Sequence, residues 1–480
     1  MAVMAEISRP ELCIVGAGAL GIALAQHARA LGARVVLADR GFAEPGDGPQ
    51  RALRVAALKA SASAATAMSN AAALGLTSSE PRISMKAVQE RARQVAADSA
   101  ALDSPERLQA LGIEVIAGPT RFVDAGTLMV GDTQIRSQAF LLAPGGDAAV
   151  PAIPGLEEAG YFTPDSILDN ARKLTHLLVI GADPEGLVLA QAFSRLGSAV
   201  TLVPQGEALA GFDLETASLL IQALTQEGVT VLDGATVRTI QPRSQGIGAV
   251  VDLADGGTAA LDLSHILICG GHLARLEGLG LDAARLRPVR GQAGRFAIGP
   301  LGQTSNRRVR VTGVAAGIAD WPQAMAHGRA VVGALVLGAA GQRPRALPQL
   351  VMTEPALAQI GRFPADPRKI APGFGLHRAN LFENDMARAL GQAQGLVKVL
   401  TDAKGRPVAA SAVGTGAAEL AGVLALAMEQ GVTIDALAGL PLPRPSLMSS
   451  LVALGENRMA GRTVSSWVRR RGALLRMLRR

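Results

Sequence analysis

The chain has 480 residues, of which 49% are hydrophobic and 18% charged, with a formal net charge of +7 and two cysteines. The apolar fraction excludes a disordered chain, and two cysteines exclude a disulfide scaffold, a multi-cysteine zinc module and an iron–sulfur cluster. No apolar run reaches the roughly 18–20 residues that span a membrane, and residues 1–10 lack the apolar core of a signal peptide. We therefore expect a soluble, cytoplasmic protein.

The first recognisable unit is a strand, a glycine-rich turn, a helix and a second strand. Residues 12–15 predict a buried strand, residues 22–31 a helix and residues 34–38 the next strand, with Asp39 directly after it. In a dinucleotide-binding unit the glycines allow a tight turn, let a pyrophosphate approach the backbone and let the helix pack on the strand, while the acid binds a ribose hydroxyl. The candidate cofactor-binding residues here are Gly16, Gly18, Ala19, Gly21 and Asp39.

A G-x-G-x-x-G match is a weak signal alone, because a chain with 55 glycines contains about 0.7 such matches by composition. The position of this one between a strand and a helix increases its weight, as does Asp39 eighteen residues after Gly21. A βαβ unit that binds no ligand is the alternative interpretation.

Two further stretches follow before the pattern returns. Residues 50–111 predict helices, and residues 120–142 alternate like a small antiparallel insert. Residues 140–155 then form an apolar strand that runs into a loop of glycines and prolines, which is typical of a domain crossing.

The second βαβ unit has a strand at 177–180, a helix at 187–196 and a strand at 199–203, and its candidate nucleotide-binding residues are Gly181 and Gly186. Asp183 replaces the central glycine. A carboxylate about 4 Å from a phosphate costs roughly 1 kcal/mol at the dielectric constant of water and about 4 kcal/mol at an effective value of 20, unless Asp183 turns outward or is protonated. No charged residue follows the second strand to read the ribose, so binding and loss of the dinucleotide both stay open.

From Arg343 the pattern changes to β-rich runs at 395–400 and 408–413, followed by an apolar helix at 418–430, which predicts a third, α+β domain. The tail, residues 469–480, holds six arginines and no acid, and without it the net charge falls from +7 to +1. Such a tail fits an anionic membrane surface or an acidic partner, or a solvated, frayed end.

Six segments occur in the order typical of one protein family, namely residues 16–39, 143–155, 181–203, 269–282, 309–333 and the region from Leu347. By this order the chain resembles the pyridine nucleotide–disulfide oxidoreductases, above all dihydrolipoamide dehydrogenase and mercuric reductase. The resemblance covers about residues 10–460. It implies an α/β fold with two Rossmann-like dinucleotide-binding domains, in which the FAD domain is interrupted by the NAD(P) domain, and a C-terminal α+β dimerisation domain.

The implied boundaries are 1–160 and 281–343 for the FAD domain, 161–280 for the NAD(P) domain, 344–465 for the dimerisation domain and 466–480 for the basic tail. The resemblance further implies bound FAD, NAD or NADP as the second nucleotide, and a homodimer formed through the C-terminal domain. It adds Gly145 and Gly313 to the candidate FAD residues, although the family's A-T-G loop has Pro144 in second place and its Gly-Asp pair has Val314 in place of the Asp.

The family's chemical groups are largely absent. Its redox-active Cys-x4-Cys pair would fall within residues 41–58, which contain no cysteine, and we expect Cys13 and Cys269 to be core residues. The family's acid/base His corresponds to Arg444, which stays protonated and cannot exchange protons near neutral pH. The carboxylate that supports this His corresponds to Ser449, and the Glu near the nicotinamide to Val188.

Two functions of different class follow. The first is a FAD-dependent NAD(P)H oxidoreductase without disulfide chemistry, which passes electrons through flavin to an unknown small acceptor. The second is a catalytically inactive relative that serves as a dimeric binding or regulatory scaffold. Its basic tail would bind a membrane surface or a partner. No catalytic residue can be assigned, the six histidines lack metal-ligand spacing, and aromatic residues are too few for a nucleic-acid surface.

Overall fold

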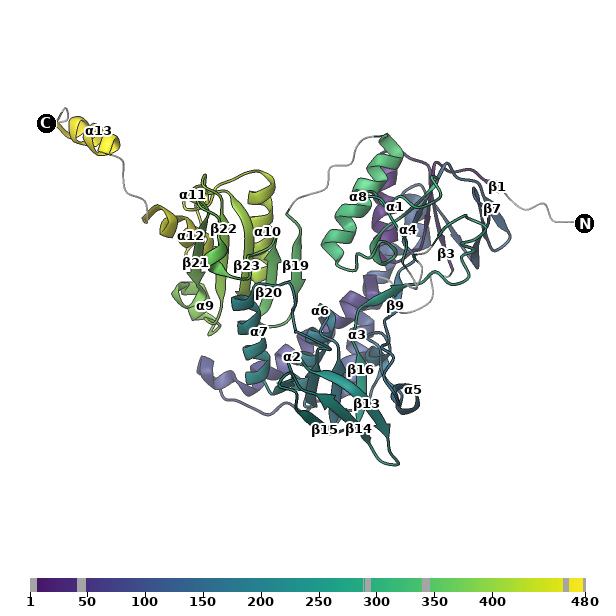
Figure 1. The fold of residues 1–480 in the computed structure, drawn as a ribbon, viewed down its shortest axis with the longest axis horizontal. Helices are drawn as coiled ribbons and strands as arrows, with labels where there is room; N and C mark the ends of the chain where they lie inside the picture. The colour runs from purple at the N-terminus through teal and green to yellow at the C-terminus, as the bar shows by residue number, and fades with distance from the viewer. Residues whose placement is uncertain are drawn as a thin grey trace, which may run out of the picture. The chain divides into compact units, whose positions relative to one another are not determined.

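The structure is a computed structural model that describes residues 7–40, 49–287, 289, 295–338, 346–460 and 466–477 (Figure 1). These residues fall into two compact units. The first comprises residues 1–210 and 224–344, and the second comprises residues 211–223 and 345–480, within the described ranges. Each unit is described by itself below.

The main sheet of the first unit has the strand order β18-β8-β2-β3-β4, and every neighbouring pair is parallel. Its strands are β2 (Leu12–Val15), β3 (Val35–Asp39), β4 (Ile113–Ala117), β8 (Ala139–Leu142) and β18 (Val309–Val311). All four residues of β2 are buried, as expected for a parallel strand covered on both faces. The predicted first βαβ unit is confirmed, with α1 (Ala19–Ala30) beginning three residues earlier than expected.

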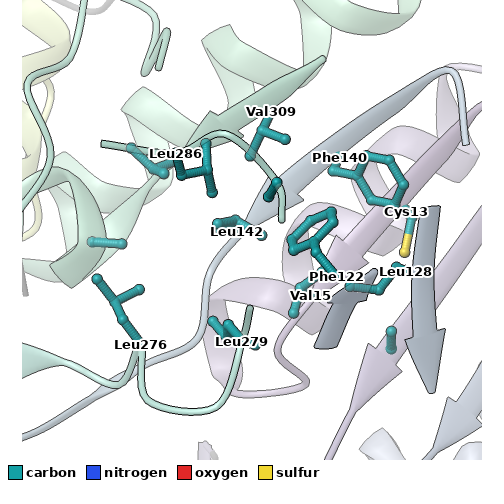
Figure 2. Close-up of a cluster of buried hydrophobic side chains, with 14 of the residues drawn as sticks. Cys13, Val15, Phe122, Leu128, Phe140, Leu142, Leu276, Leu279, Leu286 and Val309 are labelled. Carbon is teal, nitrogen blue, oxygen red and sulfur yellow. The ribbon is translucent and has the colours of Figure 1, made fainter. Parts of the chain in front are cut away.

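One face of this sheet is covered by α1 and α8 (Trp321–Leu337), which lie side by side in Figure 1. Leu12 and Ile14 of β2 pack there against apolar residues of both helices. Cys13 and Val15 alternate to the opposite face, because successive side chains of a strand point to opposite sides. Figure 2 shows this second cluster, in which the rings of Phe122 and Phe140 meet edge to face with centroids 5.1 Å apart.

A small second sheet with the order β1-β7-β6-β5 supplies part of that cluster. Its strands are β1 (Ile7–Ser8), β5 (Thr120–Asp124), β6 (Thr127–Val130) and β7 (Thr133–Ile135). Strands β5, β6 and β7 pair antiparallel, so the predicted insert is confirmed for residues 120–135. The strand at the end of the alternating stretch, β8, pairs with β2 in the main sheet instead.

The predicted helical stretch consists of α2 (Pro49–Ser69), α3 (Met85–Ala100) and α4 (Pro105–Ala110), with the short 3-10 turns Ala71–Leu74 and Ala101–Asp103 between them. Helix α2 packs against α3 and against α6 (Pro184–Arg195) of the second βαβ unit. This packing brings the first turn of α2 to the second glycine turn.

The second βαβ unit forms a parallel sheet with the order β12-β11-β10-β16. Its strands are β10 (His176–Ile180), β11 (Ala199–Val203), β12 (Val229–Val231) and β16 (His265–Ile268). An antiparallel sheet of β13 (Thr236–Pro242), β14 (Ile247–Asp252) and β15 (Thr258–Leu263) shares an apolar core with it. The remaining pieces are α5 (Leu156–Ala159), the 3-10 turn Ser166–Asp169, and the antiparallel pair β9 (Gly146–Ala148) and β17 (His272–Ala274).

The second unit is built on an antiparallel sheet with the order β19-β20-β23-β22-β21, which agrees with the predicted α+β domain. Its strands are β19 (Pro348–Val351), β20 (Ala356–Ile360), β21 (Gly375–Asn380), β22 (Leu396–Thr401) and β23 (Pro407–Gly414). Its helices are α9 (Asp385–Ala389), α10 (Ala417–Glu429), α11 (Ile434–Leu437) and α12 (Ser449–Ala460), together with the first residues of α7 (Leu214–Gln226). Apolar residues of α10, α11 and α12 cover the sheet.

The basic tail contains α13 (Ser466–Met477), in which the Arg471 guanidinium lies over the Trp467 ring at 5.5 Å from its centroid. In the part of the chain that the structure describes, no helix is long and apolar enough to cross a membrane.

Candidate functional site

The candidate FAD residues of the sequence meet at one edge of the main sheet. Because its strands are parallel, their carboxyl ends lie at the same edge, where open α/β sheets bind ligands. Gly16 follows β2, Asp39 ends β3, Gly145 follows β8 and Gly313 follows β18 by two residues. The structure thus brings together residues that are up to 297 positions apart in the chain, since 313 − 16 = 297.

The glycine turn after β2 has no room for side chains at two positions. Gly16 has φ +112°, and a Cβ atom on it would lie 2.1 Å from the Ala143 carbonyl oxygen. A Cβ atom on Gly21 would lie 1.8 Å from the Gly16 carbonyl oxygen. The two glycines therefore allow β2, the loop after β8 and α1 to approach closely, as the glycine motif requires.

The N-terminus of α1 is open to an anion. Gly18 is its N-cap, and within the described residues no side chain caps the helix and no acid lies in its first turn. The free N–H groups and the positive end of the helix dipole form a suitable phosphate site. Beside them, the Ala17 N–H donates a hydrogen bond to the Asp39 carboxylate, which places that carboxylate at the edge where a ribose would lie.

Gly313 completes this edge from the other side. It has φ +61°, and a Cβ atom on it would lie 2.7 Å from a methyl group of Leu20 in the first turn of α1. Gly145 also has a positive φ, +72°, and its carbonyl accepts a hydrogen bond from the Arg275 N–H at 3.3 Å. At Gly16, Gly21 and Gly313 a side chain would clash with neighbouring atoms of the chain, so only glycine permits this close packing around the uncapped N-terminus of α1. An uncapped helix end of this kind fits the pyrophosphate of a dinucleotide.

The second glycine turn has the same backbone arrangement. A Cβ atom on Gly181, with φ +99°, would lie 2.1 Å from the Cys269 carbonyl oxygen, and one on Gly186 would lie 2.5 Å from the Cys269 Cβ. The turn thus joins the carboxyl ends of β10 and β16, as its counterpart joins β2 and β8.

The N-terminus of α6, in contrast to that of α1, is occupied by the chain itself. The Asp183 carboxylate accepts a hydrogen bond of 2.7 Å from the Gly186 N–H and is the N-cap of the helix. Pro184 follows at the first helical position, and Glu185 adds a second acid in the first turn. Burial raises the pKa of Asp183 to about 6, although its hydrogen bond from Gly186 acts in the opposite direction. These residues do not fit a pyrophosphate when Asp183 is charged.

A cluster around Arg51 lies beside this turn. The Arg51 side chain, 15% exposed, comes from the first turn of α2 and forms ion pairs with Glu185 and, at 3.2 Å, with Asp165. Its guanidinium also lies 3.3 Å from His272 Nε2. Burial, followed by the Arg51 charge, lowers the pKa of His272. Sequence reasoning missed this cluster because its members are up to 221 positions apart.

Comparison with known proteins decides the family. Residues 10–328 match the family described as "Pyridine nucleotide-disulphide oxidoreductase", and residues 347–454 match the dimerisation domain of the same family. The chain belongs to this family. The resemblance inferred from motif order is confirmed, as is the α/β fold with a C-terminal dimerisation domain.

Two sequence relatives and one solved structure are similar to this chain. The mercuric reductase of Streptomyces lividans is 28% identical over 444 residues, covering 89% of this chain and 92% of that one. The dihydrolipoyl dehydrogenase of Thermus scotoductus is 29% identical over 359 residues, covering 72% and 75%. The Cu(II) complex of the HOCl-induced flavoprotein disulfide reductase RclA from Escherichia coli has a TM-score of 0.80 at 20% identity, covering 94% of this chain and 99% of that one.

Pyridine nucleotide–disulfide oxidoreductases are flavoproteins that depend on FAD and use NAD(P)H. The edge formed by Gly16, Gly18, Gly21 and Asp39 fits the FAD of the family. Ala19, which begins α1, belongs to the same turn. The second edge keeps the fold of a nucleotide site but has Asp183 where a phosphate would bind.

The two cysteines of this family member lie at two different sheets, one within a strand and the other just after one. Cys13 is in β2 and Cys269 directly follows β16, and their exposed fractions are 0% and 1%. Both thiols are free, and burial raises the pKa of each above its ordinary value. Because the thiolate is the reactive form, neither thiol is suited to exchange with a disulfide. The predicted core placement of both is confirmed, while residues 41–48 of the segment without cysteine lie outside the described residues.

Three residues that replace family groups have ordinary surroundings. Arg444 forms an ion pair with Asp385 at 2.9 Å, and its side chain is 88% exposed. Ser449 donates a hydrogen bond to the Ser446 carbonyl, and Val188 is buried in α6. His327, on α8, is buried, and its Nδ1 lies 3.0 Å from the Thr312 hydroxyl oxygen.

Proposed function

We propose that the protein is a flavin-dependent NAD(P)H oxidoreductase that passes electrons from bound flavin directly to a small acceptor, without a protein disulfide. Membership of the family supports a flavin-dependent oxidoreductase activity. The observation that carries the absence of a disulfide is the position of the two cysteines, since Cys13 lies in β2, Cys269 follows β16 of another sheet, and both are buried with a raised pKa. Bound FAD supplies hydride and electron-transfer chemistry that needs no protein thiol.

The residues of the first edge would hold FAD. The backbone N–H groups at the start of α1 would bind the pyrophosphate, because Gly18 leaves them uncapped within the described chain. Asp39 would bind the ribose next to the Ala17 N–H. Gly145 and Gly313, in the loops after β8 and β18, would line the same cofactor from the other side.

The acid/base role of the family's His has no equivalent at position 444. Arg444 is exposed and paired with Asp385, and a guanidinium has no acceptor atom with which to act as a base. We therefore propose an acceptor that needs no proton from this residue, such as a metal ion, a quinone or a second flavin nucleotide.

The visible spectrum of the purified protein tests this function. We expect a yellow protein with bound FAD whose absorbance is bleached by NADH or NADPH under anaerobic conditions. We also expect no reduction of a disulfide such as oxidised lipoamide or oxidised glutathione by the same preparation. A colourless protein that takes up no FAD would defeat the proposal.

A second candidate is a catalytically inactive family member that acts as a dimeric scaffold. The carboxylate cap on α6 favours it, because the helix end that should bind the nicotinamide nucleotide is already satisfied by Asp183. Bound flavin that neither nucleotide reduces would support this candidate and contradict the first. The role of the basic tail is independent of this choice.

A further inference from the structure

The two glycine turns of the chain can be compared directly, because their backbones are alike. Helices α1 and α6 both have 12 residues, and each follows a strand of a parallel sheet through a glycine with positive φ. Gly18 caps α1 without a side chain, whereas Asp183 caps α6 with a carboxylate. The backbone is therefore retained at both sites, and the chemical difference lies in the groups at the helix N-terminus.

We propose that Asp183 determines the nucleotide affinity of the second site, because its carboxylate occupies the anion position at the N-terminus of α6. A pyrophosphate would use the same N–H groups and the same end of the helix dipole. An incoming dinucleotide must therefore displace the carboxylate or bind beside it while it is uncharged. This inference rests on the proposed function, since it concerns the site that would supply the flavin with electrons.

Asp183 is held in place through both its side chain and its backbone. Its carboxylate oxygen accepts from the Gly186 N–H at 2.7 Å, and the Asp183 N–H lies 3.4 Å from the Cys269 carbonyl oxygen. Pro184 fixes the backbone at the first helical position, where its missing N–H costs nothing. Displacing Asp183 therefore breaks contacts that the folded chain already makes.

The neighbouring cation offsets only part of this negative charge. Arg51, from α2, is the cation that faces Asp183, and its guanidinium already pairs with Glu185 and Asp165. Glu185, on α6 itself, adds a like charge. A dinucleotide pyrophosphate would thus meet more acid than base at this turn.

The site should respond to pH for a physical reason. The pKa of Asp183, about 6, means that the carboxyl becomes neutral as the pH falls below 6 and is charged above it. Among the described residues, the groups that act on it include Glu185, Arg51 and the Cys269 thiol, and the pKa of that thiol is raised by burial. His272, from β17, contacts Arg51, and burial followed by the Arg51 charge lowers the pKa of its imidazole. Nucleotide binding should therefore strengthen as the pH falls from 8 to 5.5.

Calorimetric titration of the full-length holoprotein with NAD⁺ and with NADP⁺ tests the proposal at pH 5.5, 7 and 8. We compare the wild type with Asp183→Asn, which keeps an N-cap but removes the charge, and with Asp183→Gly, which removes both. Removing a charge about 4 Å from a phosphate should tighten binding at pH 8 between about 5-fold and about 900-fold. Most of the pH dependence should disappear in both variants.

Asp262→Asn is the matched control, because Asp262 is an exposed acid of the same domain that pairs with Arg243 on the surface. It should change neither affinity nor pH dependence. The FAD content of every variant is measured in parallel from its absorbance, so that loss of the flavin, which would refute the proposed function, is distinguished from a failure of this inference. Unchanged nucleotide affinity in both Asp183 variants, or no detectable binding by any variant, would overturn the assignment.

Discussion

Asp39 is the side chain on which the FAD assignment depends most directly. It ends β3, and its carboxylate accepts a hydrogen bond from the Ala17 N–H in the glycine turn. A ribose hydroxyl at this edge would find a charged acceptor fixed by the backbone. The glycines around it contribute space, whereas Asp39 contributes a specific bond.

We therefore expect Asp39→Asn to weaken FAD binding. Asn keeps an acceptor oxygen but removes its charge. Because a hydrogen bond to a charged group is worth roughly 1.5–3 kcal/mol, the FAD dissociation constant should increase by up to about 150-fold. Reconstitution of the apoprotein with FAD measures this dissociation constant. Asp132→Asn, in the exposed turn between β6 and β7, is the control and should bind FAD like the wild type. Equal affinities of the two variants would show that Asp39 does not contact the cofactor.

Single residues were predictable where the signal was local. The glycines and Asp39 follow from the spacing of one βαβ unit, and their meeting with Gly145 and Gly313 follows from the family order. For Asp183 the sequence left two alternatives open, a side chain that turns outward and a side chain that is protonated. The pattern Asp183-Pro184-Glu185 is itself a helix N-terminus signal, with a capping residue followed by proline at the first position, and it predicts the inward cap that the structure shows.

Arg51 could not be placed in the same way. Its partners Asp165 and Glu185 are 114 and 134 positions away, as the differences 165 − 51 and 185 − 51 give. Only the packing of α2 on α6 brings them together. An ion-pair cluster of this kind depends on tertiary contacts that no local pattern encodes.

At the scale of elements, the start of α7 is fixed to the sheet of the second unit by a buried ion pair. Lys398 of β22 contacts Asp213 at 2.6 Å, and the two side chains are 5% and 7% exposed. Thr216, in the first turn of α7, adds a hydrogen bond of 2.7 Å to the Ser411 hydroxyl on β23. Because both charged side chains are almost fully buried, each is stabilised mainly by the opposite charge of the other.

Replacing Lys398 by Met should destabilise the protein by roughly 3–5 kcal/mol, because Asp213 would stay buried without its cation. The double variant Lys398→Met/Asp213→Asn should recover much of this loss. Arg238→Met, which breaks an exposed pair with Asp252, should cost only about 0–1 kcal/mol. Urea unfolding followed by circular dichroism measures all three. A single variant as stable as the wild type would contradict the importance of the pair.

Strands and helices were predicted within a few residues, since period and turn residues are local properties. The strand at residues 199–203 agrees with β11, and the helix expected at 418–430 differs from α10 by one residue at each end. Both glycine-turn helices begin three residues before their predicted starts, because α1 and α6 include the last residues of the turn. The alternating pattern assigned β8 to the insert, whereas β8 pairs with β2 in the main sheet. Alternation of polar and apolar residues predicts a strand but not the strand with which it pairs.

At the scale of the whole molecule, the dimerisation domain implies a homodimer. Residues 347–454 match this domain of the family. We expect light scattering after size-exclusion chromatography to give twice the chain mass of 49.2 kDa. Because removal of residues 469–480 lowers the net charge from +7 to +1 without touching this domain, the truncated chain should elute as the same dimer. A monomeric mass for the full chain would contradict the assignment.

The domain boundaries inferred from the sequence remain predictions. The predicted NAD(P) domain, residues 161–280, encloses β10, β11, β12 and β16. The first compact unit, however, contains both nucleotide folds without dividing them. The tail likewise keeps its alternative interpretations.

The central claim is that flavin is the redox centre of this protein and that no disulfide accompanies it. Anaerobic titration with dithionite counts the electrons that the protein accepts per bound flavin. A flavin alone takes up two electrons, whereas a flavin with a redox-active disulfide takes up four, because the disulfide is a further two-electron couple. We predict two electrons per flavin, in the wild type and equally in Cys13→Ala and Cys269→Ala. Four electrons in the wild type would contradict the account.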